Sequence, residues 1–279
     1  MVHRQQRHFT VSREYLANGS PKSYKAPARD RKNVAPFDTK SSLPKKTNED
    51  PEDPDEPHTK TGQFVIGGII LACCTVTSWY LTTTNTHDMG ERNAPRKKDQ
   101  FFEDNFILSR RNIQEGRWWT IVTSSFAHTS IPHLMVNMFC LWSAGPLLYG
   151  VLGPAKFAVL YLGSSITGSA LQLSWWAHEK RPTWIGAVGA SGSLTGIFTF
   201  AAGLWPNMRM SLLFFIPMRL WQGIAAFTGF SVTALAEGWF PSIGHADHLG
   251  GMAFGAAYAG YLLFRMRKGK QTPRYLMRK

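Results

Sequence analysis

Long uncharged runs of apolar residues recur along this chain and dominate its hydropathy pattern. A bilayer core about 30 Å thick requires about 20 apolar residues in a helix. Six segments approach this length, the fifth interrupted once by Arg219: 61–86, 134–155, 157–177, 182–208, 210–236 and 249–264. A chain that crosses a bilayer must satisfy its backbone hydrogen bonds internally, so the pattern predicts an all-α membrane protein, a bundle of six transmembrane helices.

Polar segments flank these runs. Residues 1–61 are rich in basic, Ser, Pro and Asn residues and poor in large apolar ones, so we expect disorder there. Residues 1–40 carry nine Lys or Arg against three acids, as a mitochondrial presequence does, although the acidic segment 49–56 breaks the pattern. A membrane domain is predicted over 62–268, with a long loop at about 85–130 between its first two helices. A basic tail follows over 269–279.

The formal net charge of +13 narrows the possible partners. The basic residues cluster beside the apolar runs, which indicates membrane topology or contact with anionic lipid rather than nucleic acid. The cysteines Cys73, Cys74 and Cys140 all lie within apolar runs. They form neither a disulfide framework nor a metal-binding spacing, so we expect no metal and no cofactor.

Polar side chains inside apolar runs are energetically unfavourable, and they mark candidate functional sites. His133 and Asn137 share a face at the start of the second helix, Ser191 lies near the start of the fourth, and His245 and His248 begin the sixth. With six spans, the even-numbered helices all begin on the same side of the membrane. These groups are therefore expected at a similar depth.

Small residues favour close contact between the fourth and sixth helices. The segment 192–196 has glycine at both ends and borders Ser191, and the segment 251–255 has the same pattern and follows His248 by three residues. If these faces meet, the imidazole can remove the serine proton during attack on a carbonyl group. Asp247 points about 100° away from His248 on a helix, which favours a Ser-His dyad over a triad.

The same residues allow other interpretations. His133 and Asn137 can donate to an oxyanion together with the Ser191 backbone N–H, or they can form a structural interhelical hydrogen bond. Serine in a glycine-rich helix is also a common packing residue. The two histidines that begin the sixth helix could form half of a metal site with His128 or His133, although no acidic third ligand is evident.

Together, these motifs resemble the rhomboid intramembrane serine proteases. The stretches "EGRWW", "FAHTSIPHLMVNMFCLW", "GASG" and "HADHLGGMAFG" occur in the order of that family between about residues 105 and 265, and they further resemble its mitochondrial, presenilin-associated rhomboid-like branch. The resemblance implies that Ser191 is the nucleophile and His248 the general base. It also implies that His133 and Asn137 stabilise the oxyanion, and that neither metal nor ATP is required.

The resemblance also implies the partners and the location. Substrates would be single-span membrane proteins cleaved within their transmembrane segments, in the lipid bilayer of the mitochondrial inner membrane or of another organelle. The mitochondrial branch commonly has an extra N-terminal helix, whereas six helices are expected here. A non-catalytic adaptor that binds transmembrane helices is the alternative, and a transporter is a third class, disfavoured because the two halves show no repeat.

Overall fold

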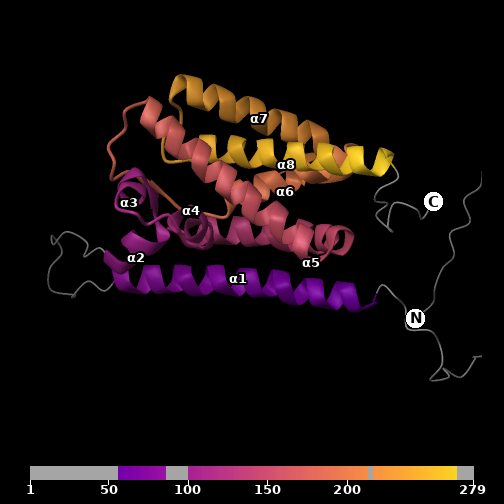
Figure 1. Cartoon of the computed structure of the whole chain (residues 1–279), viewed down its shortest axis with the longest axis horizontal. Coiled ribbons are helices and arrows are strands. Elements are labelled where there is room, and N and C mark those ends of the chain that lie inside the picture. The colour runs from indigo at the N-terminus through magenta and orange to yellow at the C-terminus, as the bar shows by residue number, and fades with distance from the viewer. Residues whose placement is uncertain (1–55, 86–99, 213–215, 269–279) are drawn as a thin grey trace, which may run out of the picture. The chain divides into compact units, whose positions relative to one another are not determined.

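The computed structural model describes residues 56–85, 100–212 and 216–268, which all belong to one compact unit (Figure 1). Among these residues the structure is mostly helical, with two short antiparallel strand pairs. Residues 1–55 of the expected disordered region 1–61 and the basic tail lie outside the described residues, whereas residues 56–61 form the start of a helix and the expectation of disorder is wrong there. The elements are α1 (Glu56–Asn85), α2 (Gln100–Phe106), β1 (Leu108–Ser109), α3 (Arg110–Gln114), α4 (Thr120–Thr123), the 3-10 helix η2 (Ser124–Phe126), α5 (Ile131–His178), β2 (Gly186–Ala187), α6 (Ser191–Leu204), β3 (Arg209–Leu212), β4 (Ile216–Arg219), α7 (Leu220–Glu237) and α8 (His245–Arg267).

Two of the described helices are long and apolar enough to cross a membrane. They are Thr61–Thr83 within α1, with a mean hydropathy of 1.9, and α5, with a mean hydropathy of 1.4. α5 bends at Gly153, whose φ of 73° is not helical and which precedes Pro154. The bend divides α5 into arms over 131–152 and 154–178, and these arms match the second and third predicted runs.

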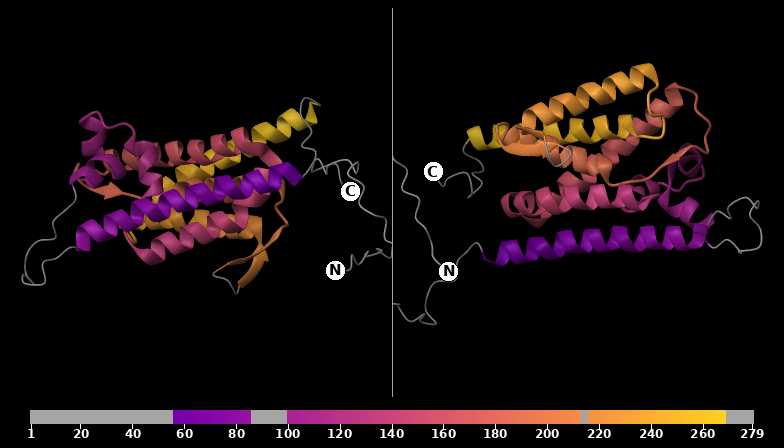
Figure 2. Two further views of the ribbon diagram at one scale, coloured as in Figure 1. Left: turned by 90° about the horizontal axis from the view of Figure 1, so that it is seen from below. Right: turned by 180° about the vertical axis from the view of Figure 1, so that it is seen from behind.

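Two other predicted runs are only partly helical. In the fourth run, α6 begins only at Ser191, because the residues before it form β2 and a turn in which Gly189 has a φ of 136°. In the fifth run, α7 begins only at Leu220, because β3 and β4 pair as a hairpin (Figure 2). A helix over the whole of the fourth or the fifth run is therefore wrong, although Ser191 does begin the fourth helix as expected. Apolar composition does not separate a helix from an apolar extended segment.

The segment between α1 and α5 packs against the helices. Phe102 of α2 is fully buried, and its ring centroid lies 4.5 Å from that of Tyr80 on α1. Buried Asn112 donates from Nδ2 to the Glu103 carbonyl oxygen at 2.8 Å and accepts from Arg117 at 3.2 Å. β1 pairs with β2, so this segment also holds the chain that leads into α6.

α6 lies at the centre of the unit, in contact with α5, α7 and α8. α1 lies alongside α5, and α7 lies beside α8 on the opposite side of the unit (Figures 1 and 2). Apolar side chains from α5 and α6, among them Leu141, Leu160, Ile197 and Phe200, are fully buried at this centre. The arrangement surrounds the first turn of α6 with protein.

Candidate active site

Helices α6 and α8 pack backbone against backbone. A Cβ atom added at Gly251 would lie 2.0 Å from the Gly192 carbonyl oxygen, and one added at Gly255 would lie 2.1 Å from the Gly196 carbonyl oxygen. This approach requires glycine at both positions of α8. Because the two contacts occur in the same order along both helices, α6 and α8 are parallel and begin at the same end. The predicted contact between the fourth and sixth apolar runs is confirmed.

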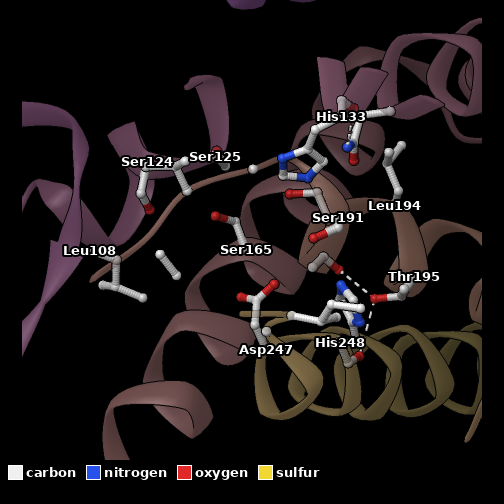
Figure 3. Close-up of a pocket in the computed structure, with 18 of the residues that line it drawn as sticks. Leu108, Ser124, Ser125, His133, Ser165, Ser191, Leu194, Thr195, Asp247 and His248 are labelled. Atoms are coloured by element: carbon white, nitrogen blue, oxygen red, sulfur yellow. Dashed lines mark hydrogen bonds between the residues drawn. The ribbon is translucent and has the colours of Figure 1, made fainter. Parts of the chain in front are cut away.

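This packing brings Ser191 and His248 to one cavity (Figure 3). Ser191 is the first residue of α6, and the His248 imidazole is directed from the first turn of α8 toward the start of α6. His248 is 8% exposed, and the Phe227 ring of α7 packs against it with centroids 5.4 Å apart. The Thr195 hydroxyl lies 3.0 Å from the Gly192 carbonyl oxygen and 3.1 Å from that of His248, which ties the first turns of both helices together.

The cavity has a volume of about 1150 Å³. Pockets for small molecules typically measure about 300–1,000 Å³, so this one can admit a polypeptide segment. It is lined by all four residues that were predicted to react or to stabilise an oxyanion, namely His133, Asn137, Ser191 and His248. His245 instead lies behind the cavity, buried with its ring centroid 5.5 Å from that of Phe230.

His133 and Asn137 border the cavity from α5. A Cβ atom added at Gly189 would lie 3.0 Å from His133 Nε2 and 3.8 Å from Ser191 Oγ, so both side chains flank the same point. Gly189 also has a φ of 136°, so glycine is required here both by this backbone conformation and by the close contact with His133. Asn137 is buried and donates one Nδ2 hydrogen bond to the His133 carbonyl oxygen at 2.8 Å, which leaves the second N–H of this amide for another acceptor.

A buried histidine holds the backbone immediately before Ser191. His128 is fully buried, and its Nε2 accepts from the Ala190 N–H at 3.4 Å while its Nδ1 lies 3.5 Å from Thr77 Oγ1 of α1. Burial, and secondarily the neighbouring His133, lower the pKa of His128 to about 3, so the ring is neutral and can accept a hydrogen bond. The sequence offered His128 only as a possible partner in an alternative metal site, because a hydrogen bond to the main chain leaves no pattern in the sequence.

Asp247 is directed away from His248, as the helical spacing predicts. Its carboxylate lies between α5 and α6: a Cβ atom added at Gly168 or at Gly192 would lie 2.5 Å from one of its oxygens. Among the described residues, His248 Nδ1 has no hydrogen-bond partner. In the described part of the chain, no acidic side chain is therefore bonded to His248 Nδ1.

The chemistry of the cavity follows from the groups that line it. Within the described ranges, no three His, Cys, Asp or Glu side chains are grouped to hold a metal ion. The histidines form two separate ring pairs, His128 with His133 at 4.9 Å and His245 with His248 at 6.2 Å. What the site offers is a hydroxyl group, an imidazole and several hydrogen-bond donors, a set that suits nucleophilic attack on a carbonyl group.

Known proteins with similar sequences share this region of the chain. The family model of the rhomboid domain matches residues 115–265, which include every residue of the candidate site. The chain is 34% identical over 154 residues to "Rhomboid protein 1, mitochondrial" of Saccharomyces cerevisiae, covering 54% of this chain and 44% of that protein. It is 31% identical over 183 residues to "RHOMBOID-like protein 12, mitochondrial" of Arabidopsis thaliana, covering 61% and 53%.

A third relative belongs to the presenilin-associated branch. The chain is 29% identical over 154 residues to "Presenilin-associated rhomboid-like protein A, mitochondrial" of Danio rerio, covering 53% of this chain and 39% of that protein. The chain thus spans about half or less of the length of these relatives. The domain match nevertheless covers more than half of this chain, and it includes α5, α6, α7 and most of α8. The chain therefore belongs to the rhomboid family.

Proposed function

We propose that this chain is an intramembrane serine endopeptidase that cleaves the transmembrane segments of single-span membrane proteins through a Ser191-His248 dyad. Membership of the rhomboid family supports this reaction class. The observation that carries the proposal is the parallel, glycine-mediated packing of α6 and α8. Because of that packing, both helices begin at one cavity, and Ser191 and His248 line the same space in which a substrate would bind.

The proposed reaction proceeds through an acyl-enzyme. Ser191 Oγ attacks the carbonyl carbon of the scissile peptide bond while the His248 imidazole takes the hydroxyl proton. The C–N bond then breaks as the imidazolium returns that proton to the leaving amine. Water attacks the resulting ester and passes a proton to His248, and Ser191 leaves as a hydroxyl after regaining it. No cofactor or metal takes part in these steps.

Donors for the developing oxyanion surround Ser191. The second Asn137 N–H and the His133 ring reach the cavity from α5. In the part of the chain that the structure describes, the Ser191 backbone N–H has no acceptor, whereas the Ala190 N–H is engaged by His128. Preorganised donors of this kind stabilise a transition state because they need no reorientation during the reaction.

We further propose that α1, both arms of α5, α6, α7 and α8 cross the bilayer. α6 has 14 residues, which corresponds to a length of about 21 Å, against about 30 Å for a bilayer core. Ser191 at its start would accordingly lie below the membrane surface, where the side chains of a substrate helix pass. The names of the three relatives place them in mitochondria, which supports a mitochondrial membrane, and we propose the inner membrane as the site of action.

The test is cleavage of a single-span reporter by the purified full-length chain in liposomes. We expect the wild-type chain to cut the reporter, and Ser191→Ala and His248→Ala each to reduce cleavage below detection, because loss of either group removes the covalent route. Ser174→Ala is the matched control, since Ser174 is exposed on α5 and its hydroxyl donates to the Ala170 carbonyl oxygen of its own helix.

Two results would contradict the proposal. Undiminished cleavage by Ser191→Ala would show that another group performs the reaction. A wild-type chain that binds the reporter tightly but never cuts it would instead support the adaptor function, in which the cavity holds a transmembrane helix without reacting with it.

A further inference from the structure

α6 begins without a cap from its own segment. The residue before its first turn is Ala190, which has no side-chain acceptor for the free N–H groups of a helix start. These N–H groups are normally bound by Ser, Thr, Asp or Asn at this position. The first turn of α6 carries Ser191, so its stability bears directly on the placement of the serine.

Asp247 of α8 occupies the place of the missing cap. Its carboxylate lies against the first turn of α6, and a Cβ atom added at Gly192 would be 2.5 Å and 2.7 Å from its two oxygens. The carboxylate thus lies beside Gly192, whose backbone N–H is one of those that the start of a helix leaves without an acceptor within the helix. In Figure 3 the carboxylate and the His248 imidazole leave α8 side by side and do not face each other.

The position of Asp247 is fixed from a third helix. Its backbone N–H donates to Oε1 of Gln172 on α5 at 3.1 Å, and Gln172 is buried. A Cβ atom added at Gly168, also on α5, would lie 2.5 Å from Asp247 Oδ1 and 2.7 Å from its carbonyl oxygen. Gly168 of α5 and Gly192 of α6 thus leave a space that the Asp247 side chain fills. Contacts with both helices restrict the position of its carboxylate.

We propose that Asp247 caps the N-terminus of α6 from α8 and so positions Ser191 relative to His248. An acidic group at a helix start is favoured by the helix dipole, and here it joins the helix of the nucleophile to the helix of the base. Asp247 is a positioning residue and not the third member of a triad. The inference rests on the proposed protease function for its readout.

The experiment compares Asp247→Ala, Asp247→Asn and the wild-type chain in the liposome cleavage assay. We expect Asp247→Ala to lower kcat roughly tenfold, the effect of removing a helix cap, with KM within about twofold of wild type. Asp247→Asn should restore most of kcat, because an amide oxygen caps a helix about as well as a carboxylate. Glu237→Ala, which removes an exposed acid at the end of α7, should leave both constants unchanged.

Equal kcat for Asp247→Ala and wild type would overturn the inference, and so would an asparagine variant as impaired as the alanine variant. The comparison also separates this inference from the proposed function. A wild-type chain that does not cut the reporter contradicts the protease proposal itself. The cap alone is contradicted if the wild-type chain cuts the reporter, Ser191→Ala abolishes cleavage, and Asp247→Ala leaves cleavage unchanged.

A second measurement does not depend on activity. Gly192→Ala should lower the thermal midpoint strongly in the wild-type background, because its methyl group meets the Asp247 carboxylate. The same substitution should lower the midpoint less when Asp247 is already alanine, since the obstructing oxygens are then absent. Effects of the two substitutions that simply add would show that the residues do not interact, and would overturn the inference.

Discussion

At the scale of single residues, the site depends on groups that hold backbone amides as much as on the reactive side chains. His128 accepts a hydrogen bond from the backbone N–H of the residue before Ser191, and the carboxylate of Asp247 lies beside Gly192, the residue after it. The amide of Ser191 itself is left for the oxyanion in the proposed mechanism. Neutral His128 suits this role because an imidazolium would have no lone pair to offer.

His128 provides a prediction at this scale. His128→Ala leaves the N–H of fully buried Ala190 without an acceptor, which destabilises the fold by about 1–3 kcal/mol and displaces Ser191. His128→Gln should keep much of the stability and activity, because a side-chain amide oxygen can accept the same hydrogen bond. Thermal midpoints and reporter cleavage measure both effects, with exposed His178→Ala as control. Equal behaviour of the alanine and glutamine variants would contradict the role.

The sequence predicted which residues line the cavity better than it predicted their contacts. His133, Asn137, Ser191 and His248 could be grouped because they lie near the starts of the second, fourth and sixth apolar runs, which begin on the same side of the membrane, and all of them line the cavity. The partners of Asp247 could not be foreseen, although its direction could. Its contacts depend on which glycines of two other helices face it, and spacing along one helix carries no such information.

At the scale of elements, glycine determines how closely the two reactive helices approach. Gly251 and Gly255 face α6, whereas a Cβ atom at Gly260, further along α8, would meet nothing within 4 Å. Alanine substitutions at these glycines of α8 should therefore have different effects. Gly251→Ala must separate the backbones of α6 and α8 and should lower stability by about 1–3 kcal/mol or more, with loss of cleavage.

Gly260→Ala is the matched control for this packing. It should leave cleavage intact and leave stability unchanged or raised by up to about 1 kcal/mol, because alanine favours a helix more than glycine does. Thermal midpoints and cleavage rates of both variants check the prediction. A Gly251→Ala variant as stable and active as Gly260→Ala would contradict the close contact.

Element boundaries were the weakest sequence-based predictions. The small-residue motifs identified the contact between α6 and α8, since glycine spacing reports directly on backbone approach. The segments before α6 and α7 were not recognised as extended because β2 and most of the β3–β4 hairpin belong to the same apolar runs as the helices that follow them. Hydropathy measures transfer to lipid, and it is insensitive to how the backbone satisfies its hydrogen bonds.

At the scale of the whole molecule, the described unit extends beyond the region that matches the family model. α1 precedes residue 115, yet its Thr77 lies against buried His128, and its Ile66 is fully buried beside Gly145 of α5. α1 thus supports the site through two contacts with the helices and loop that surround it. α1 and the region that matches the family model therefore belong to one packed unit.

Covalent labelling tests the central claim most directly. A fluorophosphonate probe is incubated with the full-length chain in liposomes, and the modified residue is located by peptide mass spectrometry. The account predicts a phosphonyl adduct on Ser191 in the wild-type chain, and a sharply slower adduct in His248→Ala, because the imidazole activates the hydroxyl. An adduct on a different serine, or labelling of Ser191 at the same rate without His248, would contradict it.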